Sequence, residues 1–369
     1  MEEIHLKILF CIGSLEKGGA ERVVSNLANS FVLNNEVSIV TTIGQIQYEI
    51  NNKIKLYSLD SSKLNKKRLN RIVKVKKLYS IIREVRPDVI VSFLREPTFR
   101  VLLLRKFIKT PIIVSVRNDP KIEYKDLKNR IIMKLLYPNA DGFVFQTEEA
   151  KEYFSKRIKN KSTIIPNPIK KEFIERKLYM GKRDKTIVSV GRLEEQKNHE
   201  LLIEAFYNIN KEIRDYKLII YGEGTLRGIL EDKIKKYGME DRILLPGVVD
   251  NIPERIERAK LFVLSSDFEG MPNALMEAMA LGLPCISTNC PCGGPKFLIK
   301  NNENGFLVKV GDKNDLKNKI KELINKNNDE LTIISKNAKE RTRDLAEEKI
   351  NEKWYEFIYK ISKGKYLKS

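Results

Sequence analysis

Two acidic residues in the segment LSSDFEGMPNALMEAMALGLP (264–284) have a spacing that suits ligand binding. Pro272 fits the first turn of a helix and the residues after it favour helix, so we expect Glu269 in the preceding loop and Glu277 within the helix. The helix N-terminus would present free backbone N–H groups from Met271 to Leu275 to an anion. Glu277 would then accept hydrogen bonds from the hydroxyls of a ribose, and Glu269 would point at the group attached beyond the phosphates.

The expected helix carries Glu277 as an isolated charge among Ala, Leu and Met residues, which is typical of a buried helix. Burying an unpaired carboxylate costs several kcal/mol. A ligand that pairs with Glu277 therefore explains this residue better than a structural role does.

A second segment, GRLEEQKNHELLIEAF (191–206), places Arg192 and Lys197 in the loop between a predicted strand and a predicted helix. Beside the positive end of that helix, the two cations suit a diphosphate that becomes a leaving group. Either residue alone would more often be an ordinary surface cation. Their shared position is informative because ligands of open parallel sheets bind at the strand-to-helix junctions.

Two further junctions are rich in glycine. Gly18 and Gly19 in GSLEKGGAERVVSNLA (13–28) open an amphipathic helix, and paired glycines let backbone amides approach a ligand. A plain tight turn is an equally good interpretation. The segment CPCGGPKFLI (290–299) either offers amides to the ligand or only turns the chain.

The elements that must position these residues alternate between β-branched strands and helical segments, which is typical of parallel α/β sheets. Two prolines, a glycine and many charges interrupt the alternation at 166–185, which we interpret as an interdomain linker. We therefore predict an α/β fold with a domain at 1–165, a second at 186–345, and a C-terminal helix at 346–369 that packs back on the first domain. The expected strands are 7–13, 36–42, 53–59, 88–93, 111–116, 141–146 and 162–166, then 186–191, 216–222, 242–247, 260–266, 284–289 and 305–310.

The net charge of +20 is unevenly distributed. The first 178 residues hold 35 Lys and Arg against 19 Asp and Glu, a net of +16, while the remainder has a net of +4. The first half is therefore expected to face nucleic acid, phospholipid or a phosphorylated substrate. A lysine-rich genome would account for the lysines but not for the asymmetry. Nucleic acid is disfavoured, because no stretch interleaves basic residues with stacking aromatics.

The sequence also disfavours several other classes of protein. It has no run of 18 apolar residues, and its N-terminus runs from two acids directly into a strand, so we expect neither a membrane span nor a signal peptide and predict a cytoplasmic location. Cys290 and Cys292 have neither a second cysteine pair nor nearby histidines, so metal and disulfide roles are not expected.

Together, GGAERV, GRLEEQKNH, YGEGTLRGIL and EGMPNALMEAMALGLP resemble family 4 of the retaining glycosyltransferases, which share the GT-B fold. The resemblance covers nearly the whole chain. It implies two Rossmann-like domains facing each other across a cleft, the first binding the acceptor and the second the nucleotide sugar. It also implies that Arg192 and Lys197 bind the donor diphosphate, Glu277 the ribose and Glu269 the transferred sugar. The donor-binding set that it implies is Gly19, Gly191, Arg192, Lys197, Glu223, Gly270, Met271, Asn273, Ala274, Leu275 and Glu277.

The chain departs from the family at one corner. Many members carry a His or His-Asp pair after the fifth strand of the first domain, whereas here Arg117, Asn118 and Asp119 follow it. The Arg-Asn-Asp sequence resembles that of a subgroup that acts on UDP-sugars in capsule, lipopolysaccharide or glycan assembly. Arg117 and Asn118, with Gly18, are therefore candidate sugar or acceptor contacts, and which of the first two touches the sugar stays open. His5 and His199 are the only histidines, so a histidine base is not expected and His199 is interpreted as a helix-start residue.

The function that this resemblance implies is retaining transfer of a hexose or N-acetylhexosamine from a UDP-sugar to a lipid-linked or oligosaccharide acceptor in cell-surface glycan synthesis. Glu269, Arg192 and Lys197 would be the catalytic residues. No Asp-x-Asp occurs and two fixed cations would replace a metal ion, so no cofactor is expected. The alternatives are a nucleotide-sugar epimerase of the same architecture, which the scarcity of histidine disfavours, and a non-catalytic nucleotide-sugar-binding protein.

The segment KLNKKRLNRIVKVKKLYSIIREVR (63–86) carries ten Lys or Arg and a single acid, Glu84. Its apolar residues recur at helical spacing, so one face should pack on the sheet and the other should be strongly basic. A solvated helix face is the simpler alternative. We predict salt-sensitive binding to an anionic membrane surface through Lys66, Lys67, Arg68, Arg71 and Lys74. The apolar face is expected to comprise Leu69, Ile72, Val73, Leu78, Ile81, Ile82 and Val85.

Overall fold

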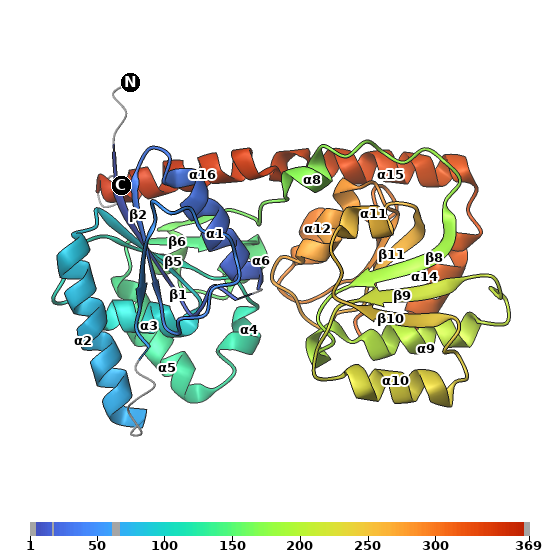
Figure 1. The fold of residues 1–369 in the computed structure, drawn as a ribbon, viewed down its shortest axis with the longest axis horizontal. Coiled ribbons are helices and arrows are strands. Elements are labelled where there is room, and N and C mark those ends of the chain that lie inside the picture. The colour runs from blue at the N-terminus through green and yellow to red at the C-terminus, as the bar shows by residue number, and fades with distance from the viewer. Residues whose placement is uncertain (1–4, 17, 61–66, 365–369) are drawn as a thin grey trace. The chain divides into compact units, whose positions relative to one another are not determined.

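The computed structural model describes residues 5–16, 18–60 and 67–364 of the chain, with the backbone alone for 67–69 (Figure 1). The chain divides into two compact units, Met1–Pro168 together with Glu348–Ser369, and Ile169–Glu347. Each unit is an α/β domain built on its own parallel sheet. The prediction of two Rossmann-like domains is therefore confirmed.

In the described part of the first unit, seven strands form a parallel sheet of order β3-β2-β1-β4-β5-β6-β7. Its central strands are short runs of Ile, Val, Leu and Phe that are buried on both faces, because helices cover both sides of a parallel sheet. The strands are β1 (Lys7–Ile12), β2 (Glu36–Thr41), β3 (Lys55–Ser58), β4 (Val89–Phe93), β5 (Ile112–Ser115), β6 (Gly142–Phe145) and β7 (Ser162–Ile164).

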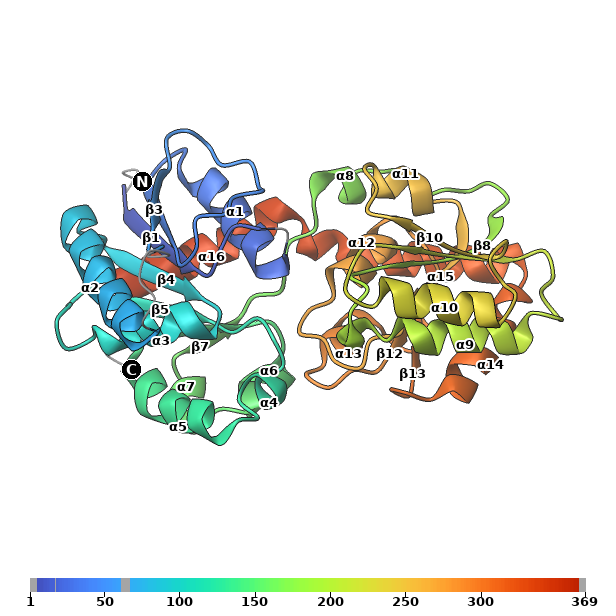
Figure 2. The same cartoon turned by 60° about the horizontal axis from the view of Figure 1, so that its bottom comes forward.

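Helices cover both faces of this first sheet, as Figure 2 shows for α2, α3 and α5 on one face and α16 on the other. Helix α16 is held by Trp354, which is fully buried and stacks on Phe93 of β4 with a ring-centroid distance of 5.5 Å. The helices are α1 (Gly19–Phe31), α2 (Lys67–Val85), α3 (Arg95–Leu103), α4 (Pro120–Glu123), α5 (Leu127–Leu136), η1 (Tyr137–Asn139), α6 (Glu148–Glu152), α7 (Lys156–Lys159) and α16 (Glu347–Ser362).

The basic segment forms helix α2, and most of its predicted inner face is correct. Leu78, Ile81 and Ile82 are buried, and Val73 and Val85 are half-buried. Ile72 is 55% exposed, so its assignment to the inner face was wrong. At 100° per residue, Ile72 and the half-buried Val73 lie about 120° and 140° around the helix from Leu78, on opposite sides, so both lie away from the face that Leu78, Ile81 and Ile82 bury. Lys66 and the side chains of Lys67, Arg68 and Leu69 lie outside the described residues.

The described part of the second unit has six parallel strands in the order β10-β9-β8-β11-β12-β13. The strands are β8 (Asp184–Val190), β9 (Lys217–Tyr221), β10 (Ile243–Gly247), β11 (Ala259–Leu264), β12 (Cys285–Thr288) and β13 (Phe306–Val308). The helical elements are α8 (Lys171–Ile174), η2 (Glu195–Lys197), α9 (His199–Ile209), α10 (Arg227–Lys236), α11 (Ile252–Ile256), α12 (Asn273–Ala280), α13 (Gly294–Leu298), α14 (Lys313–Ile324), α15 (Asn328–Thr342) and η3 (Arg343–Leu345).

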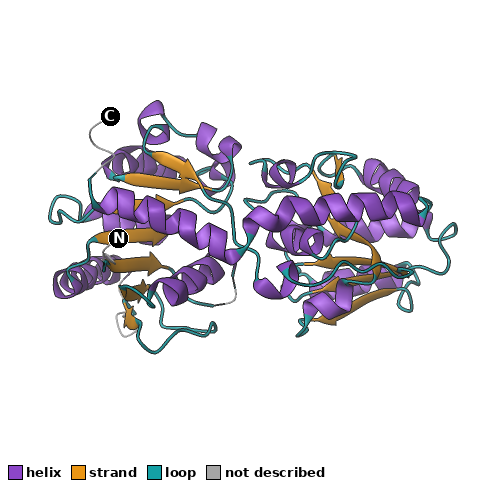
Figure 3. Cartoon of the chain, turned by 90° about the horizontal axis from the view of Figure 1, so that it is seen from above, coloured by secondary structure: helices purple, strands orange, loops and turns teal. Residues whose placement is uncertain are grey.

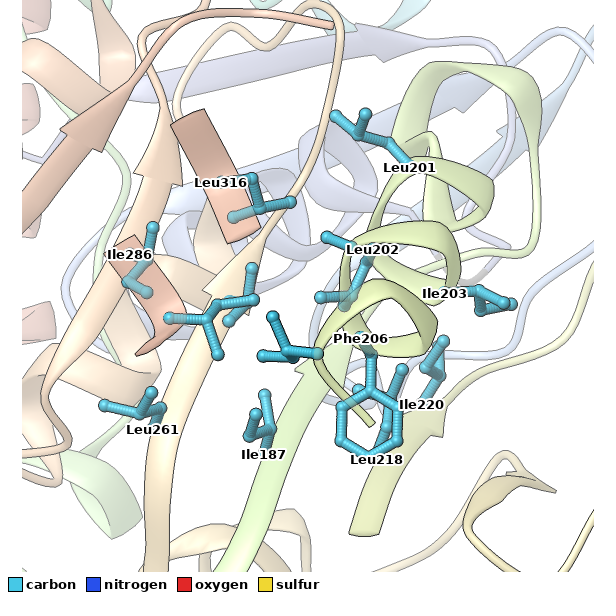
Figure 4. Close-up of a cluster of buried hydrophobic side chains, with 14 of the residues drawn as sticks. Ile187, Leu201, Leu202, Ile203, Phe206, Leu218, Ile220, Leu261, Ile286 and Leu316 are labelled. Atoms are coloured by element: carbon cyan, nitrogen blue, oxygen red, sulfur yellow. The ribbon is translucent and has the colours of Figure 1, made fainter. Parts of the chain in front are cut away.

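The core of the second unit fixes the loops at the carboxyl ends of its strands. Ile187, Leu218 and Leu261 from neighbouring strands pack against Phe206 of α9 and Leu316 of α14 (Figure 4). Viewed from above in Figure 3, helices also lie over the other face of the strands, where α12 packs on α15. All thirteen strands expected from the sequence are present, within two residues at each end.

Candidate active site

Glu269 lies in the loop after β11 and is held by side chains from two loops. Its Oε1 accepts hydrogen bonds from Lys197 Nζ at 2.5 Å and from Ser266 Oγ at 2.7 Å. Its Oε2 accepts a longer one from Gln196 Nε2 at 3.3 Å. The side chains of Lys197 and Glu269 are only 16% and 7% exposed, so the two charges form a largely buried ion pair.

The loop that carries Lys197 is fastened to the loop that carries Glu269 along its length. Asn198 Nδ2 donates to Asp267 Oδ1 at 2.8 Å, and Ser265 Oγ donates to the backbone carbonyl of Lys197 at 3.0 Å. The backbone N–H of Asp267 donates to the carbonyl of Gln196 at 2.9 Å. Strands β8 and β11 are neighbours in the sheet, and their carboxyl ends bring these loops together. The ion pair is therefore preorganised by the fold.

A further layer supports the loop behind Glu269. Thr288 Oγ1 and Cys290 Sγ both donate to the carbonyl of Ser266, at 2.5 and 3.1 Å. Burial raises the pKa of the Cys290 thiol to about 12, so it is a neutral donor. Ser266 and Gln196 were not singled out from the sequence. Their position beside the two predicted charges was the available signal, but a serine or glutamine in a loop is too common to be distinctive.

Arg192 lies at the start of the same loop and is exposed. Within the described residues its guanidinium makes no hydrogen bond or ion pair, in contrast to Lys197. The backbone around it is packed against the loop after β9, because a Cβ on Gly222 would stand 1.9 Å from the carbonyl oxygen of Gly191. Gly222 also has a φ of +145°, which favours glycine. Arg192 thus carries an exposed cation, without a side-chain partner among the described residues, on a backbone that packs closely against the loop after β9.

His199 begins helix α9, as expected, and is 4% exposed. Neither ring nitrogen makes a hydrogen bond of normal geometry. Burial lowers its pKa to about 4, and the charge of Lys197 adds to this effect. The ring is therefore neutral at pH 7 and does not add a third positive charge to the loop.

The helix that follows Glu269 begins as the sequence indicated. Pro272 precedes α12, and the backbone N–H of Met276 donates to the Pro272 carbonyl at 3.1 Å. Gly270 and Met271 are buried. Of the three residues that open the helix, the first two are half-buried and the third is buried. A Cβ on Gly294 would stand 2.0 Å from the carbonyl oxygen of Gly270, so the GGP turn packs directly against this loop. The opening residues of the helix are Asn273, Ala274 and Leu275.

Glu277 lies inside α12 and is 8% exposed. It interacts with another group of the chain, so it is not an unpaired carboxylate. The argument for a ligand role from an uncompensated buried charge therefore fails, and the proposed role rests on its position alone.

Glu223 forms a two-pronged ion pair with Arg227, one turn later. Arg227 Nε and Nη2 donate to its two carboxylate oxygens at 2.8 and 2.5 Å, and this holds the pKa of Glu223 below its ordinary value. The Glu223 side chain is 50% exposed. It lies in the loop after β9, next to the loop of Arg192, since the N–H of Leu193 donates to the Glu223 carbonyl at 2.9 Å.

The remaining predicted residues belong to the first unit. Gly18 precedes α1, and its carbonyl accepts a hydrogen bond from Tyr48 Oη at 3.0 Å. Gly19 is the first residue of α1 and is exposed. Glu21 of the first turn places its carboxylate against Gly18, where a Cβ would stand 2.2 Å from Glu21 Oε2. The chain's own carboxylate thus lies beside this helix end.

Arg117 follows β5 and is enclosed by the first unit. Its Nε donates to Ser115 Oγ at 2.7 Å and its Nη1 to Asn167 Oδ1 at 2.9 Å, while Nη2 is buried without a partner among the described residues. The guanidinium lies 5.2 Å from the ring centres of both Phe93 and Trp354. Burial lowers its pKa to about 9.

Asn118, the neighbour of Arg117, uses its side chain locally. Its Oδ1 accepts a hydrogen bond from the backbone N–H of Asp119 at 3.0 Å. Asp119 then caps the short helix α4 by accepting from the N–H of Lys121 at 2.8 Å. At the carboxyl end of β5, Asn118 and Asp119 therefore form a turn, and Arg117 packs within the first unit.

The loop after β8 carries charges of the kind that hold an anionic leaving group. Among the described residues, the Arg192 side chain has no partner and Lys197 uses one of its three N–H donors on Glu269; helix α9 begins directly after this loop. Among the described residues, no three His, Cys, Asp or Glu side chains come close enough to hold a metal ion. No described helix is both long and apolar enough to cross a bilayer.

Two family models match consecutive parts of the chain. Glycosyltransferase Family 4 matches residues 17–173, and Glycosyl transferases group 1 matches residues 170–341. An α-1,4-N-acetyl-D-galactosaminyltransferase of Campylobacter jejuni, named for a GalNAc-GalNAc-diNAcBac-PP-undecaprenol acceptor, is 30% identical over 96% of this chain and 99% of its own. The chain is a family 4 glycosyltransferase.

Other relatives support this assignment. A second Campylobacter jejuni enzyme is a diphospho-undecaprenol 4-alpha-N-acetylgalactosaminyltransferase. It is 32% identical to this chain, over 93% of this chain and 96% of its own. Anabaena HepE, solved in complex with UDP-glucose, superposes on this chain with a TM-score of 0.79 at 18% identity. The superposition covers 96% of this chain and all of HepE. The galactosyltransferase WaaB of the lipopolysaccharide outer core gives a TM-score of 0.75 at 21% identity, covering 95% and 99% of the two chains. At these identities the structures support the GT-B fold alone.

Proposed function

We propose that this glycosyltransferase transfers a hexose or N-acetylhexosamine from a UDP-sugar to a lipid-linked glycan acceptor, with retention of configuration at the anomeric carbon. The buried Lys197–Glu269 pair carries the proposal, together with Arg192 of the same loop, whose exposed guanidinium has no partner among the described residues. Its support comes from relatives named for undecaprenyl diphosphate acceptors and from a HepE structure that contains UDP-glucose. The biological setting that fits is cell-surface polysaccharide or glycan synthesis.

In the proposed mechanism the protein stabilises negative charge on the departing diphosphate. Arg192 and the two unused N–H groups of Lys197 donate to phosphate oxygens, and the first amides of α12 add to them. Glu269 fixes the direction of Lys197 through Oε1. Its Oε2, whose one contact among the described residues is the long one from Gln196, accepts from a hydroxyl of the transferred sugar.

Glu277 is assigned to the ribose hydroxyls, and Glu223 to the region of the base. Retention follows if the acceptor hydroxyl attacks from the side that the diphosphate leaves, with a phosphate oxygen taking the acceptor proton. This scheme needs no histidine base, in keeping with a neutral, buried His199. We also propose that no metal ion is required, because Arg192 and Lys197 supply the positive charge that a metal would supply.

The test is a panel of UDP-, GDP- and ADP-sugars, first by thermal shift and then by transfer to undecaprenyl diphosphate glycans. We expect a UDP-sugar to stabilise the protein and to be consumed, with an α-linkage formed from an α-linked donor and full activity in EDTA. Stabilisation by another nucleotide class would overturn the donor, and an inverted product would overturn the mechanism. Loss of activity in EDTA, restored by Mg²⁺ or Mn²⁺, would overturn metal independence.

A further inference from the structure

Helix α5 of the first unit exposes a regular row of large aliphatic side chains. Leu127, Ile131 and Leu135 are 65%, 49% and 69% exposed and recur once per helical turn, so they form one continuous stripe, the α5 stripe. The opposite face buries Met133. Single exposed aliphatic residues are common, but a stripe along one helix marks a surface that contacts something apolar.

Positive charges border the α5 stripe on both sides. At 100° per residue, Arg130 and Lys134 fall on one edge of the stripe and Lys128 on the other. Neither Lys128 nor Lys134 has an ion pair among the described residues, and Arg130 donates only to the backbone carbonyls of Tyr124 and Lys125. No acidic residue occurs from 127 to 136.

Exposed apolar residues also occur at the end of the neighbouring helix. Helix α3 packs beside α5 on the same face of the sheet, as Figures 1 and 2 show. Leu103 at its end is 55% exposed, and Phe107 just beyond it is 70% exposed. Lys106 and Lys109 flank Phe107 in the sequence. The ring of Phe107 lies on the side of α2, with its centroid 6.3 Å from that of Tyr79, so Leu103 and Phe107 flank the α5 stripe without being part of it.

We propose that the α5 stripe docks on an anionic lipid bilayer, with the aliphatic side chains at the boundary of the acyl chains and the cations at the lipid phosphates. An amphipathic helix with Lys and Arg beside its apolar face is suited to lying in the membrane interface. The proposal rests on the proposed function, whose acceptor is lipid-linked. It adds an apolar contact that salt does not screen, unlike the attraction of the basic helix α2.

The size and charge of this surface favour a membrane over a protein partner. Helix α5 has ten residues and is about 15 Å long. A stable protein interface buries about 800 Å² on each partner, with a closed and largely uncharged centre. A narrow stripe between two rows of cations lacks such a centre, whereas a bilayer provides phosphates on both sides of the inserted side chains.

The first test places a reporter in the stripe. The native Trp354 is fully buried, so Ile131→Trp adds the one tryptophan that lipid can reach among the described residues. With vesicles of phosphatidylglycerol and phosphatidylcholine carrying brominated acyl chains, we expect a blue shift and quenching that the parent protein does not show. Unquenched emission would overturn the proposal, as would emission already blue-shifted before vesicles are added, because protein would then cover the stripe.

The second test removes the stripe. The triple variant Leu127→Ser, Ile131→Ser, Leu135→Ser should bind these vesicles at least tenfold more weakly at 0.5 M NaCl, while Ile333→Ser, at a 60% exposed position of the second unit, should bind as the parent does. Unchanged binding by the triple variant would overturn the proposal. A parental dimer that becomes a monomer in the triple variant would also overturn it, in favour of a second copy of the chain.

The thermal shift with UDP separates this inference from the proposed function. The triple variant should keep the parental shift and the parental circular dichroism, because the stripe lies outside the donor loops. If UDP fails to stabilise even the parent, the proposed donor is wrong. The vesicle measurements then still decide the role of the α5 stripe.

Discussion

Lys197 Nζ and Glu269 Oε1 lie 2.5 Å apart, although the two residues are separated by 72 positions in the sequence. Both were expected at the donor, one on the diphosphate and the other on the sugar, but not in contact with each other. Because of this contact, each of the two side chains helps to fix the position of the other. Substitution of either one should therefore affect both stability and catalysis.

We expect Lys197→Ala to destabilise the second unit by about 3 kcal/mol, because it leaves the buried carboxylate of Glu269 without its counter-ion. The double variant Lys197→Ala, Glu269→Gln should recover part of this loss. Thermal unfolding without nucleotide measures the effect. Additive losses in the double variant would mean that the pair contributes no coupling energy.

The same pair makes a prediction about catalysis. Glu269→Gln should bind UDP about as well as the parent but transfer sugar on the order of 100-fold more slowly, since a contact to the sugar acts in the transition state. Glu277→Ala should instead weaken the binding of UDP. Transfer at the parental rate by Glu269→Gln would show that the carboxylate does not have the proposed role.

Arg192 should behave differently from Lys197, because its guanidinium is exposed and has no partner among the described residues. Arg192→Ala should weaken donor binding or transition-state stabilisation by about 2 to 5 kcal/mol, with the melting temperature almost unchanged. The matched control is Lys185→Ala, which removes an exposed cation paired with Asp215 at the start of β8. Equal losses of activity in both variants would indicate a general effect of charge.

The strands were predictable because each depends on a short local pattern, and the positions of the candidate active-site loops followed from the ends of the strands. The hydrogen-bond partners of Glu269 were not predictable in this way, because the pairing of β8 and β11 brings the two loops together and so places Gln196 and Ser266 beside it. Local pattern also could not show that Trp354 from the last helix would cover Arg117. Contacts between distant segments, unlike element types, depend on the packed fold.

His199 makes the stability of the second unit dependent on pH. Burial and then Lys197 lower its pKa from 6.5 to about 4, so the unfolded chain binds more protons than the folded one between these values. Stability is complete above pH 6.5 and falls as the pH drops towards 4, by about 2 kcal/mol at pH 5. His199→Leu should remove this part of the acid sensitivity while leaving UDP binding at pH 7 intact. A lost UDP shift in that variant would instead assign the ring to the donor site.

Two substitutions of Arg117 separate its role in packing from a direct contact with the transferred sugar. Arg117→Met should cost less stability than Arg117→Lys, because methionine can pack against the stacked rings of Phe93 and Trp354, whereas a lysine would bury a strongly hydrated ammonium there. The expected loss for lysine is at least about 2 kcal/mol. Transfer by a folded Arg117→Met protein at the parental rate would exclude a contact of the guanidinium with the sugar.

The basic helix α2 should provide the salt-sensitive part of membrane binding. Arg71 is exposed and Lys74 half-buried, and neither has an ion pair among the described residues. Each cation near an anionic bilayer contributes about 1 kcal/mol, so a handful of them holds a protein reversibly at the surface. We therefore expect binding to phosphatidylglycerol vesicles at low salt to fall sharply when five cations are changed to Gln. These are Lys66, Lys67, Arg68, Arg71 and Lys74.

A control with the same change in net charge separates this helix from the effect of total charge. Five exposed lysines of the second unit are changed to Gln, and this variant should bind vesicles nearly as the parent does because its cations lie outside the basic half of the chain. Equal binding of the parent to neutral and anionic vesicles, or equal losses in both variants, would return α2 to an ordinary solvated helix. The control lysines are Lys211, Lys235, Lys236, Lys300 and Lys309.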